Sequence, residues 1–204
     1  MFDWVLGPGD ARRLVREAAA RALVGGRMTL RALPVGGRVM TVAEIESAGV
    51  KRPAPWPDVL ADWSEIHEEP PYPGAASPAL AQALSSLGTP SFAVAFDPAR
   101  DAAAVAWYER GALISFEHVG RATVAWSPEG GLGRPRMAGF AGGAADVARS
   151  LGGDESILDR IEAQHAAGAR AIVERVLARL CDRPPPVDDL AGAVALAPSE
   201  VVRL

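Results

Sequence analysis

The chain has 204 residues, of which 49% are hydrophobic and 23% are charged, and its formal net charge at pH 7 is −4. This is the composition of a globular protein with one sizeable core, and it excludes a disordered chain. The negative net charge argues against a protein that lives on phosphate backbones. Because no stretch of about twenty apolar residues exists, we expect no transmembrane helix.

The basic residues are nearly all arginine, with Lys51 as the single lysine, and alanine is very abundant. We interpret this as the codon usage of a GC-rich bacterial genome. The N-terminal MFDWVLGPGD is acidic and lacks the basic start and apolar run of a signal peptide, so we expect a cytoplasmic protein. The single cysteine, Cys181, allows no internal disulfide, and we interpret it as a small apolar side chain on a helix face.

The first predicted element is a helix over about residues 11–24. Asp10 is a suitable N-cap for it, and Gly25–Gly26 would end it, because glycine tolerates the left-handed conformation after a helix. Apolar residues recur three and four positions apart and therefore share one face of this helix; they are Ala11, Leu14, Val15, Ala18 and Ala22.

A hairpin is predicted next. Met28–Leu33 and Arg38–Val42 have the pattern of two strands, and Val35-Gly36-Gly37 would form the turn between them. Residues 43–56 contain Pro53 and Pro55, and we expect them to be irregular.

Two helices are predicted on either side of a proline-rich segment. Residues 58–68 have apolar positions on one side of a short helix. The sequence EEPPYPG at 68–74 must break that helix, because proline fixes φ and removes a backbone donor. Residues 77–87 then form a further helix, for which Ser77 is the expected N-cap, Pro78 the first helical residue and Gly88 the stop.

Residues 91–127 carry the clearest pattern in the chain. They read as four short strands, SFAVAFD, AAVAWYE, LISFEHV and RATVAWS, with tight connections at Pro98–Asp101, Arg110–Gly111 and Gly120. Consecutive strands with such short connections predict an antiparallel β-meander.

Alternation along this meander assigns side chains to the two faces of the sheet. In the first strand the bulky Phe92, Val94 and Phe96 lie on one face, and Ala93 and Ala95 lie on the other. The second strand repeats the pattern, so we expect both faces of these two strands to be covered. The small side chains of the alanine-rich face would let a helix approach closely.

The C-terminal part is predicted to be helical. Residues 128–143 are glycine-rich and are expected to form a mobile surface loop. Residues 155–181 have an apolar stripe at helical spacing and predict a long helix that packs along the sheet. The prolines at 184–186 would end the globular part, and residues 187–204 would form a tail of short helices.

This tail, VDDLAGAVALAPSEVVRL, weakly resembles a helix-turn-helix pattern. The second helix would have about one turn and few basic residues to offer to a major groove. DNA binding through the tail therefore stays an alternative, and docking of the tail on the body or on a partner is the favoured interpretation.

No catalytic or metal motif is found. Glu162 and His165 have the Glu-x-x-His spacing of di-iron sites, but the chain has no second such pair. The glycine-rich segment at 130–143 does not have the spacing of a dinucleotide or P-loop motif. We therefore expect no cofactor and no metal, assign no catalytic residue, and lean against an enzyme.

We predict an α+β fold with an antiparallel meander sheet of four to six strands, packed by the long C-terminal helix and flanking helices. Residues 1–183 would form a single domain and 184–204 a helical tail that starts at the prolines. The favoured function is a non-enzymatic protein-interaction or regulatory module, a subunit of a larger bacterial assembly or a homo-oligomer. Its predicted anchors are aromatic residues in the proline-rich region, Trp56, Trp63 and Tyr72.

The alternative is a small-ligand sensor or enzyme with a pocket between the sheet and the 128–143 loop. Its predicted lining consists of one meander histidine, one meander tryptophan and two loop arginines, namely His118, Trp126, Arg134 and Arg136. A cleft where these side chains converge would favour this alternative.

Overall fold

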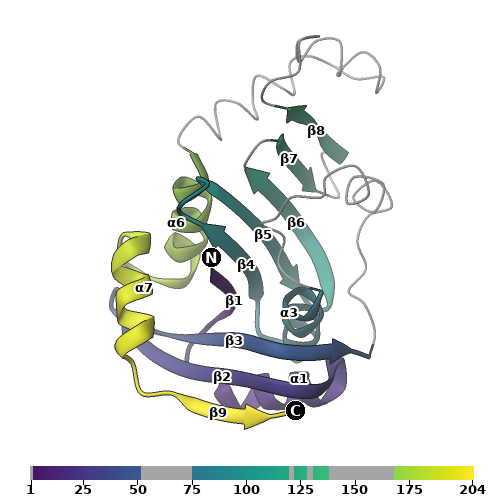
Figure 1. Cartoon of the computed structure of the whole chain (residues 1–204), viewed down its shortest axis with the longest axis vertical. Helices are drawn as coiled ribbons and strands as arrows, with labels where there is room; N and C mark the ends of the chain where they lie inside the picture. The colour runs from purple at the N-terminus through teal and green to yellow at the C-terminus, as the bar shows by residue number, and fades with distance from the viewer. Residues whose placement is uncertain (1, 52–74, 120–121, 128–130, 138–167) are drawn as a thin grey trace.

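The computed structural model describes residues 2–51, 75–119, 122–127, 131–137 and 168–204. Its described part is built around one nine-stranded sheet with the strand order β8-β7-β6-β5-β4-β1-β3-β2-β9, in which every neighbouring pair is antiparallel (Figure 1). The twist of the sheet makes β2, β3 and β9 run across the view of Figure 1, while β4 to β8 rise obliquely.

Helices pack on both faces of this sheet, so the α+β class is confirmed. The predicted size of four to six strands is wrong. The sheet gains three strands from segments for which none was predicted, namely β1 (Phe2–Pro8), β8 (Gly131–Met137) and β9 (Glu200–Arg203).

The predicted meander is confirmed. Its strands are β4 (Ser91–Asp97), β5 (Ala102–Glu109), β6 (Ala112–Val119) and β7 (Ala122–Ser127), each paired with the next. The turn between β5 and β6 consists of Arg110 and Gly111, with φ values of 50° and 80°. Two consecutive positive φ values are typical of the type I′ turn, whose twist matches that of the strands it joins.

Strand β1 was missed, although it lies in the middle of the sheet. It pairs with β4 on one side and with β3 on the other, and Trp4, Val5 and Leu6 are buried. A strand covered on both faces shows a continuous apolar run instead of an alternating one. Trp4-Val5-Leu6 is such a run, but it is short and follows Asp3; we found no signal peptide there and assigned no strand to it.

The predicted hairpin is confirmed, and it is longer than expected. Its strands are β2 (Leu23–Val35) and β3 (Arg38–Val50), so the prediction that residue 43 onward is irregular is wrong up to Val50. Gly36 in the turn has a φ of 57°, and a Cβ there would lie 2.2 Å from the carbonyl oxygen of Arg183. This position therefore excludes any side chain, and Gly36 accepts backbone hydrogen bonds from Asp182 and Arg183.

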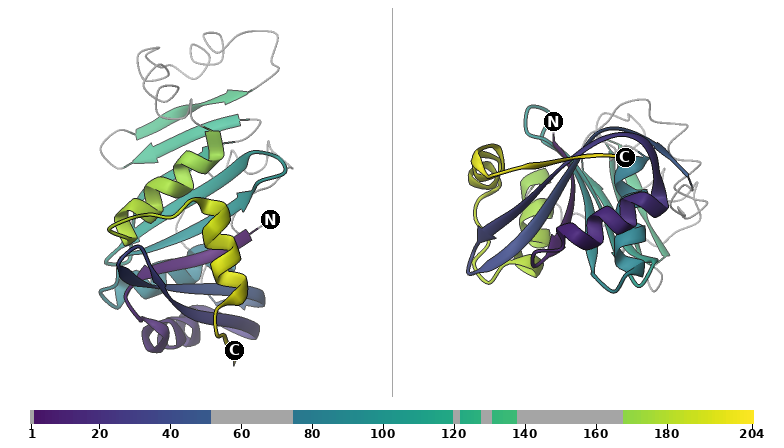
Figure 2. Two further views of the ribbon diagram at one scale, coloured as in Figure 1. Left: turned by 90° about the vertical axis from the view of Figure 1, so that its left-hand side faces the viewer. Right: turned by 90° about the horizontal axis from the view of Figure 1, so that it is seen from below.

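The two faces of the sheet are covered by different pairs of helices. The alanine-rich face packs against α1 (Arg12–Ala22) and α3 (Ala76–Ser86), which lie side by side (Figure 2). The bulky face packs against α6 (Gly168–Leu180) and α7 (Val187–Leu196).

The predicted face assignment is confirmed for β4 and β5. Phe92, Val94 and Phe96 share a cluster with Ile172 and Leu177 of α6. The alanines of the opposite face allow α3 to contact β4 and β5. The first part of the predicted helix over 155–181 lies outside the described residues, and the helix that is described has thirteen residues.

Two helix boundaries differ from the prediction. The N-cap of α1 is Ala11, without a side-chain capping hydrogen bond, and Asp10 instead binds Arg12. The chain passes from α1 directly into β2, so Gly25–Gly26 lie inside that strand. The predicted helix over 77–87 is confirmed as α3, but Ser77 lies inside it and Ala75 is its N-cap.

The helix predicted at 58–68 and the proline-rich segment after it lie outside the described residues. The glycine-rich stretch that was predicted to be a loop contains β8, so that prediction is wrong for residues 131–137. The prediction of short helices in the tail is confirmed for α7 and wrong for 200–203, which form β9. Residues 187–204 thus form a helix followed by a strand, and not a helix-turn-helix; DNA binding by this segment stays a prediction.

Candidate functional site: the free edge of strand β9

The position of β9 is set by the segment before it. Helix α7 buries Val187, Leu190 and Val194 in the cluster that includes α6 and the end of β2 nearest the hairpin turn. Pro198 follows shortly after the last helical residue, where it prevents the helix from continuing. The chain then runs back along β2 as β9, which is the last strand on this side of the described sheet (Figure 1).

The register of β9 shows which of its backbone groups face β2 and which face away from it. Val202 lies opposite Met28, and the amide of Leu204 donates to the carbonyl oxygen of Gly26 at 3.1 Å. In an antiparallel pair, alternate residues direct both N–H and C=O toward the partner strand. Val202 and Leu204 therefore face β2, and Val201 and Arg203 direct their N–H and C=O groups away from the sheet.

Position 26, near the start of β2, requires glycine because of its backbone conformation. Its φ is 103°, and a Cβ there would lie 1.8 Å from the carbonyl oxygen of Ser47. The pairing of β2 with β3 shifts register between Val24 and Arg27, as in a β-bulge. A residue with a side chain would clash here, so the position requires glycine. In this conformation the Gly26 carbonyl accepts the hydrogen bond from Leu204.

The described residues include four large hydrophobic residues that are exposed, and three of them are on β9 or next to it. Val201 is 57% exposed on the strand, Leu196 is 88% exposed at the end of α7, and Val24 is 55% exposed on β2 near its pairing with the end of the chain. Single exposed residues of this kind are ordinary, but Val201 lies on an edge strand of the described sheet, and an edge strand can pair with a further strand.

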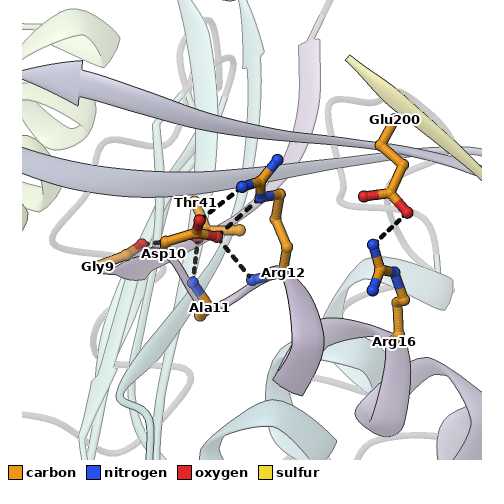
Figure 3. Close-up of polar contacts among 7 residues, drawn as sticks. All are labelled: Gly9, Asp10, Ala11, Arg12, Arg16, Thr41 and Glu200. Carbon is orange, nitrogen blue, oxygen red and sulfur yellow. Dashed lines mark hydrogen bonds and ion pairs between the residues drawn. The ribbon is translucent and has the colours of Figure 1, made fainter. Parts of the chain in front are cut away.

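The charged groups around this edge are paired, with one exception. Arg16 of α1 forms an ion pair with Glu200 of β9 (Figure 3), and Arg27 of β2 donates from Nε to Glu46 at 2.6 Å. Arg203 is exposed and has no ion-pair partner among the residues that the structure describes. Among the described residues, Arg203 is thus the charged side chain of β9 that forms no ion pair.

Helix α1 is held against this part of the sheet by a small polar network (Figure 3). The hydroxyl of Thr41 accepts a hydrogen bond from the amide of Ala11 and donates one to the carbonyl of Gly9, both at 2.7 Å. Asp10 accepts from Nε of Arg12 at 2.8 Å, and this hydrogen bond lowers the pKa of the Asp10 carboxyl. Because these contacts fix the start of α1, Arg16 lies one turn further along, within reach of Glu200.

A second set of polar contacts joins strands β1, β2 and β3. The indole of Trp4 donates to Glu44 at 2.9 Å, and the other carboxylate oxygen of Glu44 binds Arg31. On the next row Thr29 donates to Glu46 at 3.2 Å. Because these carboxylates are occupied by partners within the chain, we interpret them as groups that hold the strands in register.

Burial raises the pKa of two side chains of the core. Tyr108 is fully buried, which raises the pKa of its phenol and keeps it protonated. Cys181 is 4% exposed, and burial is the main cause of the raised pKa of its thiol. A protonated thiol is a poor nucleophile, so the interpretation of Cys181 as a small core side chain fits its surroundings.

The residues predicted for the ligand-binding alternative lie on three neighbouring strands. His118 is buried in β6 and pairs with Val124 of β7, while Trp126 of β7 pairs with Phe116. Arg134 and Arg136 belong to β8, a strand where a loop was expected. Their joint role in a pocket stays a prediction. The predicted anchors Trp56, Trp63 and Tyr72 lie outside the described residues.

The residues that define the β9 edge, Val201 and Arg203, were missed by the sequence analysis. The signal was present in Pro198-Ser199-Glu200-Val201-Val202-Arg203, where a helix-stopping proline precedes two adjacent β-branched residues. Valine favours strands, but the resemblance to a helix-turn-helix led to a helical interpretation.

Within the described ranges, no group of three or more His, Cys, Asp or Glu residues is placed to hold a metal ion. Of the helices in those ranges, none combines the length and the apolar character needed to cross a membrane. Comparisons of the chain with known protein families, with curated proteins and with solved structures found no match. The interpretation of the site therefore depends on its geometry alone.

Proposed function

We propose that the chain is a protein-interaction module of a larger assembly, and that it binds an extended segment of a partner protein along the free edge of β9. The observation that carries this proposal is the outward direction of the N–H and C=O groups of Val201 and Arg203, next to exposed apolar side chains. An open strand edge is a template for a further strand, which supplies the complementary backbone groups.

The size of the edge indicates the strength of binding. Two outward-facing residues offer up to about four backbone hydrogen bonds, each worth roughly 0.5–1.5 kcal/mol net. This gain is offset by the ordering of the added strand and by the loss of its translational freedom, which cost at least about 4 kcal/mol. The backbone alone therefore supports weak binding, and the exposed side chains Leu196, Val201 and Val24 are expected to supply the rest.

The proposal is tested with a proline substitution that acts on the outer edge alone. Val201→Pro removes an outward N–H and keeps the inward bonds of Val202 and Leu204, and proline is tolerated on edge strands in that orientation. The matched control is Val201→Thr, which keeps the amide and the β-branched shape. Each variant is immobilised and used to capture proteins from a lysate of the source organism, with quantification by mass spectrometry.

We expect the wild type and Val201→Thr to capture the same partner in stoichiometric amounts, and Val201→Pro to lose it. Equal capture by Val201→Pro would contradict the proposal, and so would the absence of any stoichiometric partner while the pure chain sediments as a monomer. If Trp63→Ala loses the partner and Val201→Pro keeps it, the partner binds at the aromatic residues predicted from the sequence and not at β9.

A further inference from the structure

We infer that the segment bound at β9 is an antiparallel strand with an acidic residue opposite Arg203 and an apolar residue opposite Val201. The acidic residue would come two positions before the apolar one, because antiparallel strands run in opposite directions. This inference rests on the proposed function and adds to it the kind of sequence that is recognised. It follows from the orientation of two side chains and from the charge balance around them.

The orientation of the added strand follows from the sheet. All eight pairs of neighbouring strands in the described part are antiparallel. Antiparallel pairing is also slightly more stable for each residue than parallel pairing. The outward groups of Val201 and Arg203 would then each face one residue of the added strand, at a Cβ separation of about 5 Å.

The charge of the partner follows from a difference between Arg203 and its neighbours. Arg16 is paired with Glu200, Arg27 with Glu46 and Arg31 with Glu44. Arg203 has no carboxylate partner in the described part of the chain, although it lies at the open edge. An added carboxylate opposite Arg203 would supply one, and a basic residue there would be repelled.

The apolar requirement follows from Val201. Its side chain is 57% exposed and lies on the same face of β9 as Arg203, because the two residues are two positions apart on one strand. An apolar side chain opposite Val201 would remove apolar surface of both residues from water. Together the two contacts define an acidic–any–apolar order along the added strand.

The same geometry favours a peptide over a nucleic acid. Each outward residue of β9 presents one donor and one acceptor, a pattern that another peptide strand matches and that phosphate oxygens, which only accept, do not match. Arg16 and Arg27 already have carboxylate partners, so the described part of this surface offers no row of unpaired arginines.

The test uses two synthetic peptides that differ at one position, acetyl-Thr-Glu-Thr-Val-Thr-Gly-amide and the same peptide with lysine in place of glutamate. Each is titrated into the full ¹⁵N-labelled chain. Binding is measured from the chemical shift of the Arg203 amide in every variant, and also from the Val201 amide where residue 201 is not proline. We expect the glutamate peptide to bind at least roughly 1.4- to fivefold more tightly, the range for an attractive cross-strand charge pair. We expect Arg203→Glu to reverse the preference, and Val201→Pro to lose both peptides.

The possible failures can be told apart. A preference for glutamate that survives in Arg203→Glu would overturn the inference about charge, while loss of both peptides in Val201→Pro would still support binding at the edge. Binding of both peptides to Val201→Pro at wild-type strength would overturn edge binding itself. If neither peptide binds the wild type, the inference about sequence is wrong, and capture of the partner from the lysate then decides the proposed function alone.

Discussion

The two edge strands of the described sheet differ in the residues that form them. The edge strand β8 contains Gly131, Gly133 and Pro135, and its pairing with β7 shifts register. Proline, glycine and irregular pairing are devices that prevent an edge from accepting another strand. The opposite edge strand of the described sheet, β9, has four residues, with two adjacent valines between Glu200 and Arg203, and contains no proline, glycine or register shift. Of the two edges, β9 is therefore the one suited to bind a partner.

The two elements of the C-terminal segment, α7 and β9, have different roles. Helix α7 buries apolar side chains and belongs to the core, whereas the strand that follows it has alternating backbone groups directed outward. The segment that was predicted to be a separate tail thus adds a strand to the sheet and presents the surface that we propose for binding. A partner strand at β9 would extend the same sheet.

The largest effect is expected from a proline at the neighbouring position. Val202→Pro removes an amide that faces β2, so it should release β9 and leave a backbone acceptor on Met28 without its donor. We expect the free energy of unfolding to fall by about 1–3 kcal/mol, as measured by urea denaturation. Val201→Pro is the matched control and should stay closer to the wild type. Equal losses for the two variants would show that the assigned directions of the amides are wrong.

An intermediate effect is expected at the other edge. Pro135→Val restores an amide and adds a β-branched residue to β8, so it removes one of the devices that block pairing. We expect this variant to self-associate more strongly than the wild type in sedimentation velocity runs over a concentration series. If its sedimentation matches that of the wild type at every concentration, the composition of β8 does not account for the contrast between the edges.

The smallest effect is expected from the ion pair between α1 and β9. Glu200→Gln removes the partner of Arg16, and both side chains are partly exposed to solvent, at 39% and 45%. Exposed ion pairs contribute about 0–1 kcal/mol, so thermal unfolding should change little. A double-mutant cycle with Arg16→Gln measures the coupling directly. A coupling energy well above this range would mean that the pair holds β9 in place.

Much of the fold could be predicted from the sequence because its signals are local. The meander follows from alternation and short turns, and the assignment of Phe92 and Ala93 to opposite faces needed only the period of a strand. The hairpin turn at Gly36 also carries its own signal, since it needs positive φ values.

The segments that were mispredicted depend on distant contacts. Strand β1 lies between β3 and β4, which come from other parts of the chain, and its apolar run fits any buried element. Strand β9 is four residues long and is a strand because β2 offers an edge to it. The adjacent valines of β9 gave a local signal for a strand. The outward direction of its backbone groups could not be predicted, because it depends on the pairing with β2 and not on residue type.

The most direct test is amide hydrogen exchange along β9, measured by NMR with and without the captured partner. In the free chain we predict fast exchange at Val201 and Arg203, and slow exchange at Val202 and Leu204, which face β2. With the partner bound, we predict that Val201 and Arg203 become slow as well. Protection of Val201 and Arg203 in the free chain, or no change at either amide when the partner binds, would contradict binding at the edge of β9.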